Sequence, residues 1–510
     1  MKSRHFLFVI LLVSVSQLFA LSDTLPVQLG EMVAKGKKAI YLFQFDAARQ
    51  TFREMKAAYP EYPHGYFYSA YLTALLYSQD KSNDSLEADL LEEIELAIER
   101  GEAYAEASDD SPEAQFYLGL SHGVLGLYYV LDKSYVQAYL NGRKAKNYLE
   151  KLVKTAPDYY DAYLGLGVYH YYLDLMPGLV KFFAGILGFH GDRALGLREI
   201  QTTAAKGTFF SVEARFIEAT LRYFLQGEKQ QMLPRFYQLD GEFPGNPITP
   251  LLIGYHYRRR GKIEKAIPYF QSVRDDFKAE LPQVFVMKYF NIGVCLYRLN
   301  ALQKADSVFA HLQTAPVRKT PYYLAGIAYY RGLIADLQFK RSVAERFYAE
   351  IPKNKHTQYY YNISRINVLY PMDEALRLYY LAENAIYRAN FPEAVRYVAG
   401  LEKIYQRKRS GYSVPFMPVL IKDLQGRLYF RQGAIRKAAE HYRDFIEHVR
   451  QVTDDFYRAW IYIQYARILR EQQKWQQAES VLELAEKCDD EYTKLIINRE
   501  RFLLKNHRTG

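Results

Sequence analysis

A pattern of about 34 residues recurs along this chain, and a period of that length is typical of stacked helical repeats. Residues 247–280 carry Ile253-Gly254, then Ala266 and Phe270. The same residue types return at the same offsets in four further copies, at residues 286–319, 375–408, 419–452 and 459–492. Small residues at the Gly and Ala places let two antiparallel helices approach closely, while large residues fill the space between neighbouring pairs.

Partial copies extend the pattern toward the amino terminus, where Gly36, Ala48 and Phe52 lie at the offsets of the repeat. A degenerate copy begins near Tyr322. The chain resembles the tetratricopeptide repeat (TPR) family over most of residues 27–492. The resemblance implies an all-α fold, a right-handed superhelical solenoid of antiparallel helix pairs. No persistent alternation of β-branched residues predicts a strand.

The regularity of the copies suggests a division of the chain. We expect divergent TPR-like repeats over residues 23–246, with an apolar insertion near 173–195. More regular repeats follow over 247–492, and a capping helix and tail over 493–510. We expect two acidic stretches inside the first region, residues 80–89 and 101–112, to be loops. A helix start follows them, with Ser111 as its cap and Pro112 in its first turn.

The insertion ends in a second recognisable motif. Gly188, Phe189, Gly191, Asp192 and Arg193, with Gly196-Leu197 after them, resemble the inclusion-body-clearance group of TPR proteins. That resemblance implies an adaptor without catalytic activity. The apolar residues before the motif either fold inward, as apolar runs of soluble chains do by default, or make a peripheral membrane or partner contact through residues 175–190.

The amino terminus has the features of a targeting signal. Lys2 and Arg4 precede an apolar run from Phe6 to Leu21 that is shorter than the roughly 20 residues a bilayer requires. We expect residues 1–22 to be a signal peptide and the chain to be exported, periplasmic or secreted, in a bacterial envelope. An uncleaved membrane anchor is the alternative. Export departs from the inclusion-body-clearance group, so that group's cellular role does not carry over.

Charge is distributed unevenly. Residues 251–510 hold 43 Lys and Arg but 27 Asp and Glu, whereas the whole chain carries a net charge of +10. A basic second half favours an acidic partner, and the absence of any nucleic-acid-binding motif argues against nucleic acid. The two cysteines, Cys295 and Cys488, rule out a disulfide framework and are expected to be free thiols.

Motifs for catalysis are missing. The sequence has neither the Gly-x-x-x-x-Gly-Lys-Ser/Thr phosphate loop nor a His-Glu-x-x-His zinc helix, and Gly165-Leu-Gly167 lacks the rest of a dinucleotide loop. The 11 histidines are dispersed. His122, His170 and His190 lie in the region that carries the insertion and could converge, but we expect them to have core or surface roles. We therefore expect no enzyme, no catalytic residue, no metal and no cofactor.

The TPR resemblance implies that places 2, 5, 9, 12 and 13 of each copy face the concave side of the solenoid. Tyrosines and arginines that could hold a protein or acidic peptide occupy many of these places: Tyr255, Arg258, Arg259, Tyr297, Arg298, Tyr379, Tyr387, Arg427, Arg431, Trp460, Arg467 and Arg470. Alternatively, these arginines pair with acids on neighbouring helices. The sequence thus predicts an exported TPR scaffold or adaptor that binds a protein partner, or else a periplasmic module for an anionic glycan or lipid.

Overall fold

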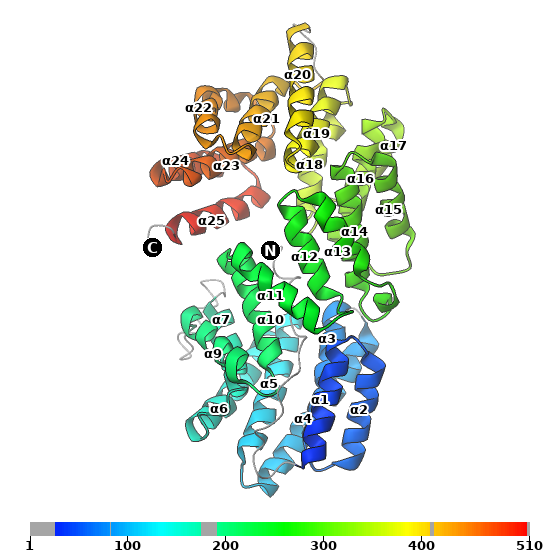
Figure 1. The fold of residues 1–510 in the computed structure, drawn as a ribbon, viewed down its shortest axis with the longest axis vertical. Coiled ribbons are helices and arrows are strands. Elements are labelled where there is room, and N and C mark those ends of the chain that lie inside the picture. Colours follow the sequence, from blue (N-terminus) through cyan, green and yellow to red (C-terminus); the bar gives the residue numbers. More distant parts are fainter. Residues whose placement is uncertain (1–25, 82, 175–190, 408–412, 507–510) are drawn as a thin grey trace. The chain divides into compact units, whose positions relative to one another are not determined.

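The computed structural model describes residues 26–81, 83–174, 191–407 and 413–506 (Figure 1). Within these ranges the chain is helical and has no strand, so the predicted all-α solenoid of antiparallel helix pairs is confirmed. No helix within these described ranges combines the length and the apolar character that crossing a membrane requires.

The helices form two compact units. The amino-terminal unit comprises the residues up to Ile253 together with Val273–Val284, and the carboxy-terminal unit comprises Gly254–Ser272 and the residues from Phe285 onward. Helix α12 (Ile248–Arg259) begins in the first unit and ends in the second.

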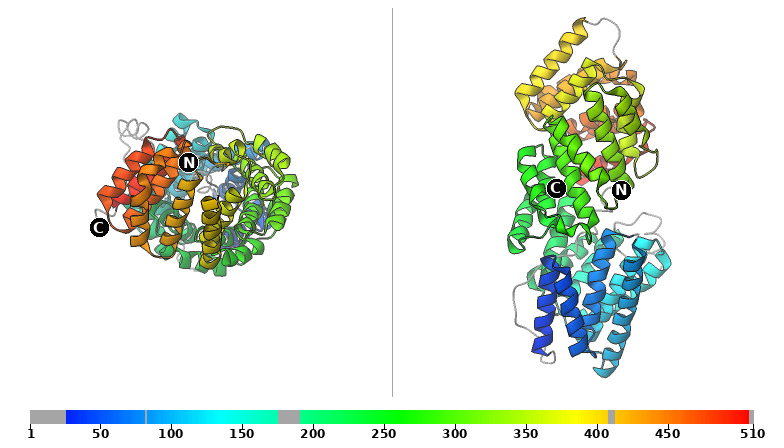
Figure 2. Two further views of the ribbon diagram at one scale, coloured as in Figure 1. Left: turned by 90° about the horizontal axis from the view of Figure 1, so that it is seen from above. Right: turned by 90° about the vertical axis from the view of Figure 1, so that its right-hand side faces the viewer.

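The amino-terminal unit is built from consecutive antiparallel helices, of which α1 to α4 are seen side by side in the right-hand view of Figure 2. Its helices are α1 (Val27–Tyr41), α2 (Phe45–Ala58), α3 (His64–Gln79), α4 (Asp84–Ala107), α5 (Pro112–Asp132), α6 (Tyr135–Thr155), α7 (Ala162–Asp174), α9 (Arg193–Lys206), α10 (Ser211–Leu221), the π-helix η2 (Arg222–Gln226), α11 (Lys229–Glu242) and the short 3-10 helix η3 (Asp276–Lys278).

In the carboxy-terminal unit the helices follow one another around a curve, as the left-hand view of Figure 2 shows. They are α13 (Ile263–Ser272), α14 (Pro282–Arg298), α15 (Leu302–Thr314), α16 (Pro321–Leu337), α17 (Arg341–Ala349), α18 (Gln358–Leu369), α19 (Glu374–Tyr387), α20 (Phe391–Arg407), α21 (Met417–Arg431), α22 (Ile435–Phe445), the 3-10 helix η4 (Ile446–Gln451), α23 (Asp455–Glu471), α24 (Trp475–Glu486) and α25 (Glu491–Asn506).

The repeat pattern is explained by close contact within each helix pair. A β-carbon added to Gly254 would lie 2.7 Å from the ring of Phe270, and one added to Gly293 would lie 2.7 Å from the ring of Phe309. The glycine of the first helix therefore makes room for the aromatic side chain of the second. Both rings are completely buried, so each pair contributes apolar surface to the core.

Two segments differ from the sequence expectations. Helix α4 runs through most of residues 80–89 and 101–112, for which the sequence predicts loops. It forms because Asn83 caps its amino terminus and because Leu90, Ile94 and Ala97 bury one stripe of an otherwise acidic surface. Helix α18 lies between the pair α16–α17 and the pair α19–α20, and the repeat pattern did not predict it. The helix start at Ser111 is present, since its side chain accepts from the backbone N–H of Ala114.

A buried ion pair helps to hold the amino-terminal unit together. The ammonium of Lys37 on α1 lies 2.8 Å from a carboxylate oxygen of Glu213 on α10, and the hydroxyl of Tyr41 donates to the same oxygen at 2.7 Å. The ammonium also lies 3.6 Å from the ring centroid of Phe210. Burial lowers the pKa of Lys37 despite this carboxylate, so losing Glu213 would leave a buried cation without its counterion.

The predicted signal peptide, residues 1–22, and the predicted membrane contact, residues 175–190, lie outside the described residues. Cys295 and Cys488 are buried free thiols, as expected.

Candidate partner-binding surface

The carboxy-terminal turns of three helices in the carboxy-terminal unit meet at one place. The hydroxyl of Tyr387, at the end of α19, donates to the carbonyl of Arg258 on α12 at 2.7 Å. The guanidinium of Arg431, at the end of α21, donates to the carbonyl of Tyr387 at 2.9 Å and to that of Arg260 at 3.4 Å. Gly261 has a φ of 74° and approaches the Tyr387 carbonyl so closely that a side chain would not fit. The three turns are thus held together by backbone carbonyls.

Five cations gather at this junction, and we call them the basic turn cluster: Arg258, Arg259, Arg260, Lys262 and Arg431. All except Arg258 are exposed. Throughout the described ranges, no carboxylate forms an ion pair with any of the five, and the Nε atom of Arg258 has no hydrogen-bond acceptor. Helix carboxy termini carry partial negative charge, which helps to accommodate these cations without acids. The cluster is therefore positive and accessible.

Tyrosines stand beside the cluster. The ring centroid of Tyr255 lies 5.2 Å from the guanidinium carbon of Arg258 and 6.0 Å from that of Arg259. Tyr359 and Tyr492 contact each other at a centroid distance of 5.1 Å. Burial raises the pKa of Tyr492, and the positive charge of Arg259 partly offsets this rise. Burial raises the pKa of Tyr359 to about 12, although its side chain remains partly accessible. The hydroxyls of Tyr359 and Tyr492, whose pKa values burial raises, stay protonated at neutral pH and can donate hydrogen bonds.

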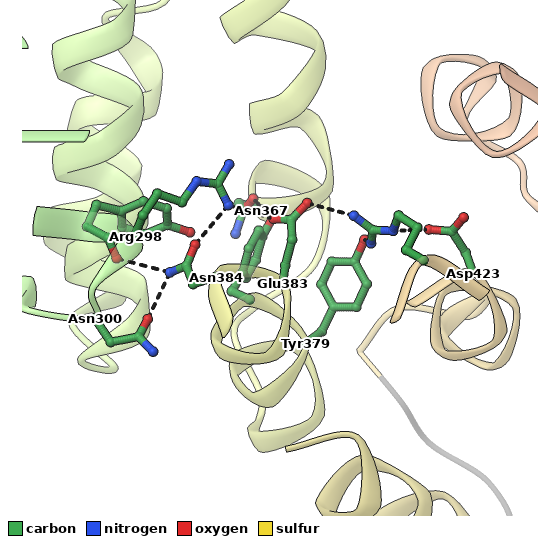
Figure 3. Close-up of polar contacts among 10 residues, drawn as sticks. Arg298, Asn300, Asn367, Tyr379, Glu383, Asn384 and Asp423 are labelled. Carbon is green, nitrogen blue, oxygen red and sulfur yellow. Dashed lines mark hydrogen bonds and ion pairs between the residues drawn. The ribbon is translucent and has the colours of Figure 1, made fainter. Parts of the chain in front are cut away.

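Two other predicted arginines are already paired (Figure 3). Arg298 donates to Asn384 at 2.8 Å and lies 3.6 Å from Glu383, while Arg427 lies 3.1 Å from Glu383 and 2.9 Å from Asp423. Burial alone would raise the pKa of Glu383, but the two guanidiniums lower it. Glu383 therefore bridges Arg298 and Arg427, and both charges are largely neutralised.

The neighbourhood of this bridge also contains the predicted tyrosines. Arg427 donates to the hydroxyl of Tyr379 at 3.2 Å, and Arg298 lies over the ring of Tyr387 at 4.5 Å. Tyr297 is buried, and its carbonyl accepts from Asn384 at 3.1 Å. The bridge is consequently part of the packing between α14, α19 and α21.

The remaining predicted residues form a separate group on α23. Arg467 donates to Glu500 of α25 at 2.8 Å and lies 5.3 Å from the ring of Trp460, and Arg470 pairs with the same carboxylate. Glu500 is buried. This group joins α23 to α25, and its two arginines share one carboxylate.

The predicted set therefore divides into three groups, and its role in binding stays a prediction. Sequence reasoning missed Arg260 and Lys262 of the cluster, and also the acids Glu383, Asp423 and Glu500. The signal for two of the acids was present, since Glu383 occupies place 9 and Asp423 place 5 of their copies.

Comparisons with known proteins agree with the repeat assignment. The family described as Iml2/Tetratricopeptide repeat protein 39 matches residues 161–331, which include the motif that resembles the inclusion-body-clearance group. No curated protein sequence matches the chain significantly.

Three solved structures are similar to the chain at low sequence identity. The hetero-tetramer Cut9-Hcn1 of APC/C is 12% identical, covers 96% of this chain and 91% of its own, and gives a TM-score of 0.23. The P58(IPK) TPR domain is 11% identical, with coverages of 88% and 100% and a TM-score of 0.21. Naa15/Naa10 bound to HypK-THB is 13% identical, with coverages of 93% and 66% and a TM-score of 0.26.

The assignment depends on the family match and on the helix pairs themselves. This chain is an all-α helical-repeat protein, and its residues 161–331 match the family described as Iml2/Tetratricopeptide repeat protein 39.

Proposed function

We propose that this protein is a non-enzymatic scaffold that holds an acidic segment of a partner protein at the basic turn cluster. The observation that carries the proposal is the absence, in the described part of the chain, of any carboxylate paired with Arg258, Arg259, Arg260, Lys262 or Arg431. Arginine binds carboxylates through forked hydrogen bonds, and the neighbouring tyrosines offer flat surface with a polar tip.

The energetics favour a modest affinity. Each hydrogen bond to a charged group contributes on the order of 1.5–3 kcal/mol before the cost of ordering the two partners. The cations of the cluster are exposed, so solvent and salt weaken each contact. Several contacts made together would hold an acidic segment with an affinity of about micromolar.

The paired arginines are poorer candidates for this role. A ligand at Arg298 or Arg427 would compete with Glu383, and a ligand at Arg467 or Arg470 would compete with Glu500. Breaking a partly buried ion pair has a cost that an exposed, unpaired cation avoids. The proposal therefore retains Arg258, Arg259 and Arg431 as binding residues and adds Arg260 and Lys262.

We also propose that the protein works after export, in the periplasm or outside the cell. The support is the basic start and apolar run within residues 1–22. Cell fractionation followed by sequencing of the mature amino terminus tests this. A full-length chain that remains in the cytoplasm would contradict export without affecting the binding proposal.

Fluorescence anisotropy with a labelled glutamate-rich peptide tests the binding site. The triple variant Arg259→Glu/Arg260→Glu/Lys262→Glu should weaken binding by about tenfold or more, because each reversal replaces an attraction with a repulsion. The control is Arg396→Glu/Arg443→Glu/Arg450→Glu, which makes the same change of net charge at three exposed positions in the same unit.

The control variant should retain nearly the full affinity. Equal losses in the two variants would show that only net charge matters and would contradict the proposed site. A sulfated glycan that competes with the peptide at equal charge would favour the anionic-glycan alternative instead.

A further inference from the structure

Exposed apolar side chains are concentrated at the tip of one helical hairpin in the amino-terminal unit. Thirteen large hydrophobic side chains are exposed in the described part of the chain, and four of them fall within eleven residues where α5 ends and α6 begins. They are Val130, Tyr135, Val136 and Leu140, with exposed fractions of 40%, 64%, 72% and 45%. Single exposed hydrophobic residues are ordinary, whereas a group of them marks a contact surface.

The tip has a well-defined backbone. Lys133 adopts a φ of 68° and ends α5, and the N–H of Ser134 donates to the carbonyl of Tyr129 at 3.0 Å. Behind the tip the two helices are in close contact, because a β-carbon on Gly126 would lie 3.2 Å from the backbone nitrogen of Gly142. The apolar side chains are therefore presented by a tight turn between two closely packed helices.

Basic side chains flank the apolar ones. Lys133, Arg143 and Lys144 are exposed, and none of the three pairs with a carboxylate anywhere in the described ranges. Asp132 is the one acid between residues 130 and 144, and it accepts a hydrogen bond from Ser134. On the neighbouring helix α4, Glu87 accepts a hydrogen bond from the hydroxyl of Tyr128. Along the first ten residues of α6, where Val136 and Leu140 lie, the charged side chains are the two cations Arg143 and Lys144.

We propose that this hairpin tip docks on the surface of a membrane that contains anionic lipids. Its apolar side chains would enter the boundary between headgroups and acyl chains, and Lys133, Arg143 and Lys144 would meet the lipid phosphates. The proposal involves residues of the amino-terminal unit only, so it does not depend on the basic turn cluster.

Vesicle flotation with the full chain tests this proposal. The wild-type protein should float with vesicles of phosphatidylglycerol and phosphatidylethanolamine, and less with vesicles of phosphatidylcholine. Val136→Glu/Leu140→Glu should reduce the bound fraction by about tenfold or more, since it removes apolar insertion and adds repulsion. Arg143→Glu/Lys144→Glu should abolish the preference for the anionic vesicles.

The matched control is Val395→Glu/Leu495→Glu, which introduces the same charges at two apolar positions that are each 49% exposed on other helices. The control should float like the wild type, and circular dichroism should show that every variant is folded. A wild-type chain that fails to float, or a Val136→Glu/Leu140→Glu variant that floats unchanged, would overturn the proposal.

Sedimentation velocity on the same variants distinguishes a membrane from a second copy of the chain as the partner of the hairpin tip. A wild-type dimer that dissociates in Val136→Glu/Leu140→Glu, without flotation, would identify a second copy of the chain as the partner and would reject the membrane. Binding of the glutamate-rich peptide should be unchanged in all tip variants, so failure here is separable from failure of the proposed function.

Discussion

Arg259 and Arg298 occupy the same place, the thirteenth, in two neighbouring copies of the repeat, yet their surroundings differ. Arg298 meets Asn384 and Glu383 on α19, whereas Arg259 lies near Tyr255 and has no acidic partner among the described residues. A repeat place fixes the direction in which a side chain points. Whether the charge is neutralised depends on helices more than eighty residues away in the sequence. An arginine at the same repeat place can therefore form a structural ion pair in one copy and be a candidate binding residue in another.

The largest effect expected from this comparison concerns Glu383. Glu383→Gln leaves the partly buried guanidiniums of Arg298 and Arg427 without their shared counterion, which should cost about 3 kcal/mol of unfolding free energy. Urea unfolding followed by circular dichroism measures this loss. Glu447→Gln, at an exposed carboxylate, is the control and should change stability by less than about 0.5 kcal/mol. A loss at Glu383 no larger than that of the control would show that the bridge is not structural.

The pH dependence of that loss follows from the sign of the pKa shift. The guanidiniums of Arg298 and Arg427 lower the pKa of Glu383 below its ordinary value of 4.5 even though burial opposes them. The stabilisation by this carboxylate is then fully present above pH 4.5 and is lost as the pH falls through the folded-state pKa. Unfolding curves of the wild type and Glu383→Gln should therefore converge in acid. A difference that stays constant down to the most acidic folded condition would contradict the direction of the shift.

The smallest effect is expected at the basic turn cluster. Arg259→Gln/Arg260→Gln removes two exposed cations that have no acidic partner in the described ranges, so the unfolding free energy should change by less than about 0.5 kcal/mol. The affinity for the glutamate-rich peptide should nevertheless fall. Added salt should weaken peptide binding to the wild type, because exposed charges are screened. A large loss of stability in this variant would mean that the cluster is structural after all.

Much of the fold was predictable because the contacts within each helix pair follow from the spacing of residues in the repeat. Gly254 and Phe270, or Gly293 and Phe309, reveal their close contact through sequence spacing alone. Helix α4 was not predicted, because acidic residues dominate its sequence and its buried apolar stripe, which starts at Leu90, is narrow.

The pairing of the site residues was harder to predict. The contacts of Tyr387 with Arg258 and of Asn384 with Tyr297 join helices that the curvature of the carboxy-terminal unit brings together. Spacing within one copy contains no information about such contacts. The acids at places 5 and 9 were visible in the sequence, but which cation each would meet was not.

The central claim is that the unpaired cations, and not the paired ones, hold the partner. Photo-crosslinking from two aromatic positions tests it most directly, with benzoylphenylalanine replacing Tyr255 beside the basic turn cluster in one variant and Trp460 beside Arg467 in the other. The account predicts that the labelled glutamate-rich peptide crosslinks at position 255 and not at position 460. Crosslinking at position 460 alone, or equally at both positions, would contradict it.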